Sequence, residues 1–198
     1  MFSYILFDLD GTVSDPKAGI TGSVQYALHA LGIEEPDLDR LEPFIGPPLR
    51  DSFQEYYNLN EEQTEFAVKK YRERFCAKGI YENILYPGMK ELLNRLKESG
   101  CHLAVASSKL EVSVTEILRY FAIGDCFEVT VGSEPDGRRS KKEEVVEEAL
   151  HRFFTDGKIP FDDIVMVGDR KFDIVGGKEY GLHQIGVTYG YAPEGELE

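Results

Sequence analysis

The chain has 198 residues, of which 42% are hydrophobic and 29% are charged, so it can bury a sizeable core and is not expected to be disordered. Its net charge of −14 argues against nucleic acid and anionic membranes as partners, because both attract basic surfaces. The three scattered cysteines fit neither a disulfide framework nor a zinc site. Without a signal-peptide pattern or a membrane-length apolar stretch, we expect a soluble, cytoplasmic protein.

The first predicted element is a strand over residues 4–8, because a short, continuously apolar run is typical of a strand covered on both faces. From Lys17 to about residue 80, the apolar residues have the spacing that is typical of helices, and we expect no strand in this stretch. Within this stretch we expect three helices, at residues 17–31, 47–57 and 61–78.

After residue 86, strands and helices alternate. We expect strands at residues 103–106, 127–131, 164–167 and 184–188, and helices at 89–99, 114–121 and 145–154. Such alternation is typical of βαβ units, which form a parallel sheet with right-handed crossovers. The predicted fold class is therefore α/β: a Rossmann-like core formed by residues 1–15 and 84–198, with a small all-helical cap inserted at residues 16–83 after the first strand.

Polar residues follow four of the predicted strands. In a parallel sheet ligands bind beyond the carboxyl ends of the strands, so these segments should meet at one edge. The four segments are Asp8–Thr12, Ser107–Lys109, Asp136–Lys142 and Gly168–Asp173.

Four carboxylates, those of Asp8, Asp10, Asp169 and Asp173, converge at this edge. Packed carboxylates repel one another unless a cation lies between them, and Mg²⁺ prefers oxygen ligands. One carboxylate could then attack phosphorus, while a second, two residues further on, could protonate the leaving oxygen and later activate water.

Positive charges and hydroxyls also gather near the edge, although the protein as a whole is acidic. A phosphoryl group needs positioning and charge stabilisation, which Ser107, Ser108 and a lysine could supply. We expect further positive charges around the site, at Lys109, Arg138, Arg139, Lys141, Lys142, Arg170 and Lys171.

These motifs resemble, in order and spacing, the four motifs of the haloacid dehalogenase superfamily. They are DxDGT at 8–12, the serine at 107, a lysine near 142 and GDxxxD at 168–173. The resemblance implies a magnesium-dependent phosphatase, with Asp8 as nucleophile and Asp10 as general acid and base. It also implies that Asp8, Asp10, Asp169 and Asp173 form the metal site and that Ser107 and Lys142 hold phosphate.

Within the superfamily, the acidic residue at Asp10 favours phosphatases over dehalogenases. The helical cap, FIGPP at 44–48 and DGRR…K at 136–142 resemble members similar to phosphoglycolate phosphatases and 5′-nucleotidases. Many such members have DGSR where this chain has DGRRSKK, so either Lys141 or Lys142 could be the motif lysine. We favour Lys142, because it leads directly into the predicted helix.

Each motif residue also has a purely structural interpretation. Asp8, Asp10 and Asp169 could be turn residues, Asp173 a charge at a helix N-terminus, and Ser107 a helix cap. Other residues are candidates for contacts with the substrate or the cap; they are Arg50, Lys109 and Arg139.

The predicted function is a Mg²⁺-dependent phosphomonoesterase for a small phosphorylated metabolite resembling phosphoglycolate. The alternatives are a 5′-nucleotidase or a pyrophosphatase on the same scaffold, then a sugar phosphomutase, then a non-catalytic protein that binds a phosphorylated ligand. We expect neither nucleic acid, membrane nor an obligate protein as partner.

Overall fold

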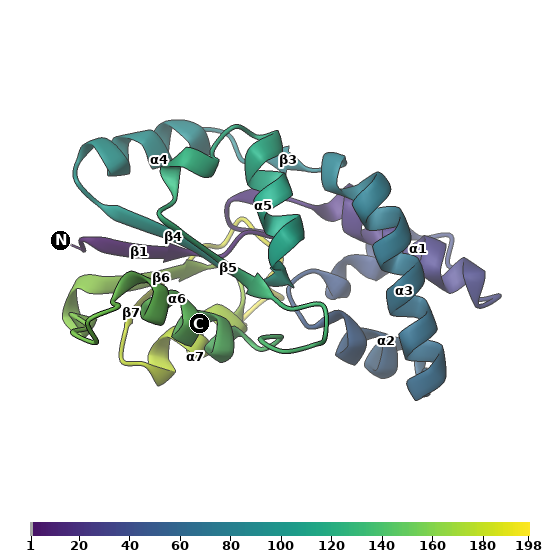
Figure 1. Cartoon of the computed structure of the whole chain (residues 1–198). Helices are drawn as coiled ribbons and strands as arrows, with labels where there is room; N and C mark the ends of the chain where they lie inside the picture. Colours follow the sequence, from purple (N-terminus) through teal and green to yellow (C-terminus); the bar gives the residue numbers. More distant parts are fainter. Residues whose placement is uncertain (1) are drawn as a thin grey trace. The chain divides into compact units, whose positions relative to one another are not determined.

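The structure, a computed structural model, describes residues 2–198. The chain divides into two compact units, of which the first is Met1–Asp15 with Leu85–Glu198 and the second is Pro16–Ile84 (Figure 1). The second boundary lies one residue later than the predicted one. That the two units behave as separate domains stays a prediction.

A five-stranded sheet forms the centre of the first unit, in the order β5-β4-β1-β6-β7. All neighbouring strands are parallel, which confirms the predicted α/β class. In the central strand, Tyr4 pairs with His102 on one side and with Ile164 on the other. The strands are β1 (Tyr4–Phe7), β4 (His102–Leu110), β5 (Val129–Ser133), β6 (Ile164–Gly168) and β7 (His183–Gly186).

Helices cover both faces of this sheet, with α4 and α5 on one face and α6 and α7 on the other (Figure 1). They are α4 (Met89–Glu98), α5 (Glu111–Tyr120), α6 (Lys142–Phe153) and α7 (Lys171–Glu179), with short 3-10 turns at Gly124–Cys126 and Phe161–Asp163. The α6 face is apolar: Val146 and Leu150 pack with Leu6, Ala104 and other buried strand residues. Each fully buried aliphatic side chain of this size stabilises the fold by about 1.5–3 kcal/mol.

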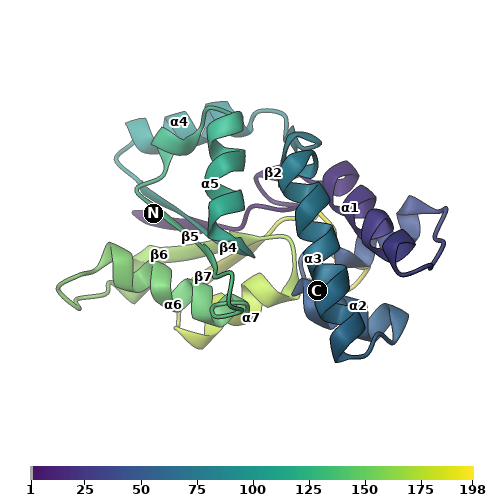
Figure 2. The same ribbon diagram turned by 45° about the vertical axis from the view of Figure 1, so that its right-hand side comes forward.

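Helices dominate the second unit, as the spacing of apolar residues predicts. They are α1 (Lys17–Ala30), α2 (Leu49–Tyr57) and α3 (Glu61–Ala77), with 3-10 turns at Leu38–Phe44 and Gly79–Tyr81. Helix α1 packs against α3 (Figure 2). The side chain of Asn60 accepts a hydrogen bond from the Gln63 N–H at 3.0 Å, which fixes where α3 begins. The two-residue strands β2 (Ser14–Asp15) and β3 (Ile84–Leu85) lie where the chain passes between the units.

Several elements begin earlier than predicted. Helices α5 and α6 start at Glu111 and Lys142, three residues before their predicted starts at 114 and 145. Apolar spacing marks only the buried face of a helix; the first turn of α6 is charged, and the one apolar residue in the first turn of α5, Val112, is exposed. Conversely, β4 continues past its predicted end at 106, through the polar residues Ser107 to Lys109, and ends at Leu110.

Among the helices of residues 2–198, none is both long enough and apolar enough to cross a membrane.

Candidate active site

The predicted edge of the sheet brings the motif residues together. Asp8 follows β1, Ser107 lies in the second half of β4, and Asp169 follows β6; these three strands are neighbours. Lys142 and Asp173 stand in the first turns of α6 and α7. Residues that are far apart in sequence thus meet at one place because parallel strands all end at the same side.

Three carboxylates form the centre of the site. One oxygen each of Asp8, Asp169 and Asp173 lies within 4.8 Å of the others. Their exposed fractions are 5%, 0% and 1%, so water screens their mutual repulsion poorly. Burial and the neighbouring charge of Asp8 raise the pKa of Asp169 to about 7, even though the Tyr191 N–H stabilises its charge. The cluster therefore holds more negative charge than its surroundings can compensate.

Lys142, and not Lys141, enters this cluster. Its Nζ atom lies 2.5 Å from Asp8 Oδ1, 2.7 Å from Asp173 Oδ1 and 3.0 Å from the carbonyl oxygen of Ala106. Burial alone would lower the pKa of Lys142, but the charges of Asp173 and Asp8 outweigh burial and raise it. The lysine thus stays charged and fixes one oxygen of Asp8. Lys141 is exposed.

The segment after β1 turns back sharply, as the predicted chemistry requires. The N–H groups of Val13 and Ser14 both donate to the Leu9 carbonyl, at 2.9 and 3.0 Å. Gly11 has a φ of +85°, and a Cβ atom there would lie 2.2 Å from Asp169 Oδ2. Only glycine is compatible with both the left-handed backbone and the close carboxylate.

This turn places Asp10 beside Lys109. The Lys109 Nζ lies 2.6 Å from Asp10 Oδ2, and both side chains are about nine-tenths buried. The other oxygen, Asp10 Oδ1, is buried with no hydrogen-bond partner among the described residues. Burial raises the pKa of Asp10 while the lysine opposes the shift, so this carboxyl group is suited to exchange a proton.

Ser107 is 2% exposed and accepts a hydrogen bond from the Lys109 N–H at 3.4 Å. It does not cap α5, whose N-cap residue is Leu110 without a side-chain cap bond, so the structural interpretation of Ser107 is wrong. Ser108 is half-buried beside it. Asp173 has a structural role in addition to its place in the cluster. Its Oδ2 atom accepts a hydrogen bond from the Arg170 N–H at 3.0 Å, at the start of α7.

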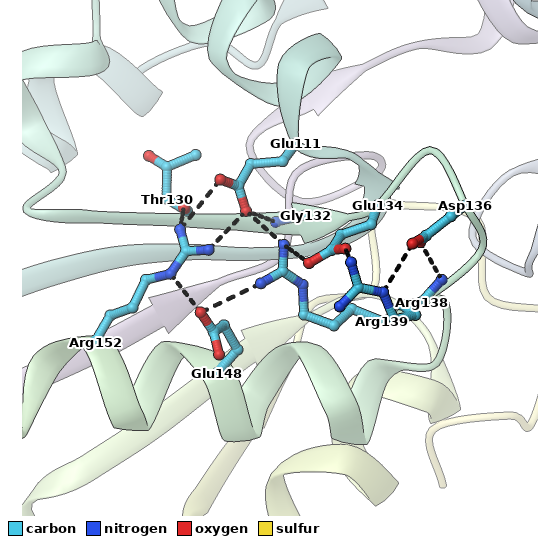
Figure 3. Close-up of polar contacts among 9 residues, drawn as sticks. All are labelled: Glu111, Thr130, Gly132, Glu134, Asp136, Arg138, Arg139, Glu148 and Arg152. Carbon is cyan, nitrogen blue, oxygen red and sulfur yellow. Dashed lines mark hydrogen bonds and ion pairs between the residues drawn. The ribbon is translucent and has the colours of Figure 1, made fainter.

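Acidic partners neutralise several of the basic residues that were expected to gather around the site. Arg139 pairs with Glu134, Glu148 and Glu111 at 3.1, 3.2 and 3.3 Å (Figure 3). Arg138 pairs with Asp136 at 2.8 Å.

Two further basic residues are also paired. Arg170 pairs with Glu196 at 2.7 Å. In the second unit, Arg50 pairs with Glu61 and Glu65. Substrate contacts by Arg50, Lys109 and Arg139 stay predictions.

Two features of the site were not predicted. Thr12 donates its hydroxyl to Asp169 Oδ1 at 3.3 Å, and its position inside the DxDGT motif could have indicated such a role. The Tyr191 N–H donates to Asp169 Oδ2 at 2.7 Å. A backbone donor leaves no trace in the choice of side chain, so no sequence signal pointed to it.

A parallel α/β sheet whose central strand is followed by two carboxylates, beside a buried lysine and a second acidic pair, is an arrangement suited to the hydrolysis of phosphoryl groups. The family model of haloacid dehalogenase-like hydrolases matches residues 5–187. The chain belongs to this family, and the enzyme class predicted from the motifs, a phosphatase, is confirmed.

The similar proteins carry different names, two of a phosphatase type and one of a kinase. The chain is 48% identical over 193 residues to a 5′-nucleotidase of Pseudomonas aeruginosa, a match covering 98% of this chain and 86% of the relative. It is 37% identical over 187 residues to the tyrosine-protein kinase PtkA of Mycobacterium tuberculosis, covering 94% of this chain but 62% of the relative. The crystal structure of a predicted phosphatase from Clostridium acetobutylicum superposes with a TM-score of 0.94 at 45% identity, covering 100% of this chain and 89% of that one.

Proposed function

We propose that this chain is a Mg²⁺-dependent phosphomonoesterase that acts on a small phosphorylated metabolite through a phosphorylated Asp8. The observation that supports this most directly is the placement of Asp8. One of its oxygens is fixed by Lys142, and the carboxylates of Asp169 and Asp173 stand beside it. A buried carboxylate held in this way is oriented for attack on a phosphorus atom.

In the first step, an oxygen of Asp8 forms a bond to phosphorus while the bond from phosphorus to the ester oxygen breaks. Asp10 donates its proton to that leaving oxygen. In the second step, water attacks phosphorus, Asp10 takes up the proton, and the bond between Asp8 and phosphorus breaks to release phosphate. Lys142, with the hydroxyl of Ser107 and the neighbouring Ser108, would stabilise the charged phosphoryl oxygens throughout.

The residues fit a magnesium ion. Three buried carboxylates lie close together, and burial with their mutual repulsion raises the pKa of Asp169 to about 7 and also raises the pKa of Asp173. An all-oxygen donor set of this kind suits a hard divalent cation. Asp8, Asp169 and Asp173 would hold the ion, together with Asp10 as the family resemblance implies. When bound, the ion would compensate the charge of the carboxylates and of the phosphoryl group.

For the substrate we keep two candidates. A phosphoglycolate-like metabolite follows from the sequence resemblance. A nucleoside 5′-monophosphate is favoured by the relative that is 48% identical over 98% of this chain and is named 5′-nucleotidase. A pyrophosphatase activity on the same scaffold is the remaining alternative.

The test is phosphate release from phosphoglycolate, nucleoside 5′-monophosphates, sugar phosphates and pyrophosphate, with Mg²⁺ or with EDTA. We expect Mg²⁺-dependent release with a preference for one class. Asp8→Asn should lower release at least about 1,000-fold while the protein stays folded, because the amide is a poor nucleophile. The matched control is Asp162→Asn, at an exposed aspartate. Full activity of Asp8→Asn would contradict the mechanism, and silence of the wild type across the panel would favour a binding protein.

A further inference from the structure

A short segment after the last strand, Tyr189–Gly190–Tyr191, packs against the acidic cluster; we call it the 189–191 strap. It lies three residues beyond the end of β7 at Gly186. None of the four sequence motifs includes it. Its contacts connect a carboxylate of the site with two other parts of the first unit.

The first set of contacts fixes Asp169. The Tyr191 N–H donates to Asp169 Oδ2 at 2.7 Å. Gly190 lies so close that an added Cβ atom would be 2.3 Å from Asp169 Oδ2 and 2.5 Å from the carbonyl oxygen of Gly11. Any residue with a side chain would therefore collide with Asp169 at this position. Together these two residues support the side of Asp169 that carries Oδ2.

The second set of contacts anchors the strap. The Tyr189 hydroxyl donates to the carbonyl oxygen of Thr12 at 2.9 Å, and its ring packs against Tyr86 with centroids 4.8 Å apart. The Tyr191 hydroxyl donates to Oδ1 of Asp15. Asp15 is the last residue of the unit's N-terminal segment, and Tyr86 is the second residue after the chain returns. The strap is thus held at both places where the first unit's chain is interrupted.

We propose that the 189–191 strap positions Asp169 for cation binding, which rests on the proposed magnesium site. Asp169 is completely buried and is repelled by Asp8 and Asp173. A carboxylate in that situation turns away from its neighbours unless hydrogen bonds fix its orientation. The strap supplies one such bond, from the Tyr191 N–H, and Gly190 packs directly against the carboxylate. Partners that orient a metal ligand in this way typically contribute about 10- to 100-fold in metal affinity.

A variant of Gly190 tests this without changing any proposed ligand. Gly190→Ala places a methyl group where Asp169 lies, so the strap and the carboxylate must separate. We expect its Mg²⁺ dissociation constant, measured by calorimetry on the full chain, to rise about 10- to 100-fold. The Mg²⁺-induced rise in melting temperature should shrink accordingly. The matched control is Gly124→Ala, because an added Cβ there meets only Leu118, at 4.0 Å.

A second variant covers the case in which Gly190→Ala does not fold. The double variant Tyr189→Phe/Tyr191→Phe removes both hydroxyl anchors but keeps the Tyr191 N–H and the glycine. We expect a smaller loss, about three- to tenfold in Mg²⁺ affinity, because the strap becomes less firmly held. Circular dichroism in EDTA separates unfolding from a loss of metal binding.

Asp169→Asn distinguishes failure of this inference from failure of the proposed function. If the wild type binds Mg²⁺, Asp169→Asn does not, and a folded Gly190→Ala binds as tightly as the wild type, the strap has only a structural role and the inference is overturned. If Gly190→Ala is unfolded, the inference is overturned when the folded double variant binds Mg²⁺ as tightly as the wild type. If the wild type itself shows no Mg²⁺ binding, the proposed metal site fails and this inference fails with it.

Discussion

The Nζ atom of Lys142 lies 2.5 Å from Oδ1 of Asp8, although 134 residues separate the two in the chain. The same atom also reaches Asp173, so one lysine compensates two of the three clustered carboxylates. This relationship favours Lys142 over Lys141 as the motif lysine of the DGRRSKK segment, and the choice can be tested.

Lys142→Met should lower phosphate release at least about 100-fold, because Asp8 loses its orientation and the phosphoryl oxygens lose a cation. It should also destabilise the metal-free protein by about 3–5 kcal/mol, since two buried carboxylates are left unpaired. Lys141→Met is the matched control and should remain within about twofold in activity. Urea unfolding in EDTA and phosphate-release assays measure both effects. The opposite ranking of the two variants would make Lys141 the motif lysine.

Asp169→Asn should make the metal-free protein more stable at pH 8. Burial and the charge of Asp8 raise the pKa of Asp169 from its usual 3.8 to about 7. Between these values the folded state binds more protons than the unfolded state, so stability falls as the pH rises through this window. At pH 8 the wild type bears the full cost of this charge. We expect the asparagine variant to gain about 1–3 kcal/mol.

The measurement is thermal unfolding of both proteins from pH 5 to pH 8 in EDTA. The advantage of the variant should shrink toward pH 5, where the wild-type carboxyl group is protonated in the folded state. Adding Mg²⁺ should reverse the order by stabilising only the wild type. A variant that is less stable than the wild type at pH 8 in EDTA would contradict the prediction.

Glu111 should contribute stability that disappears in acid. It accepts hydrogen bonds from Arg152 and from the Gly132 N–H, and pairs with Arg139 (Figure 3). Burial alone would raise the pKa of Glu111, but the bonds from Arg152 and Gly132 outweigh it and lower the pKa. Because its pKa is lowered in the folded state, the charged Glu111 carboxylate stabilises the fold at pH values above its usual pKa of 4.5. This stabilisation is lost as the pH falls through the pKa of the folded state.

We therefore expect Glu111→Gln to lose about 1 kcal/mol of stability at pH 7, and to approach the wild type as the pH falls below 4. Melting curves at pH 7, 5 and 3.5 give this comparison. Glu98→Gln, on the exposed end of α4, is the control. An equal deficit at all three pH values would show that the glutamate acts through packing and not through its charge.

The sequence predicts the acidic part of the site well because each carboxylate follows a strand of recognisable pattern. Asp8 and Asp169 directly follow two neighbouring strands, and the parallel topology brings them together. The ion pairs of Arg139 could not be predicted from the sequence. Its partners Glu111 and Glu134 come near it only because the fold places the start of α5 and the end of β5 beside it. The Tyr191 contact uses a backbone N–H, which any residue except proline could supply.

The position of β1 in the sheet has a consequence for synthesis on the ribosome. Tyr4 pairs with His102 and with Ile164, so one of the two neighbours of β1 is made 160 residues after it. At about 5–20 residues per second, this strand waits about 8–30 s for that neighbour. During this delay, the unpaired edge of β1 can pair with a wrong strand. The acidic cluster can assemble only after β6 has been made. Nascent chains should therefore depend on holding chaperones more than the size of the protein suggests.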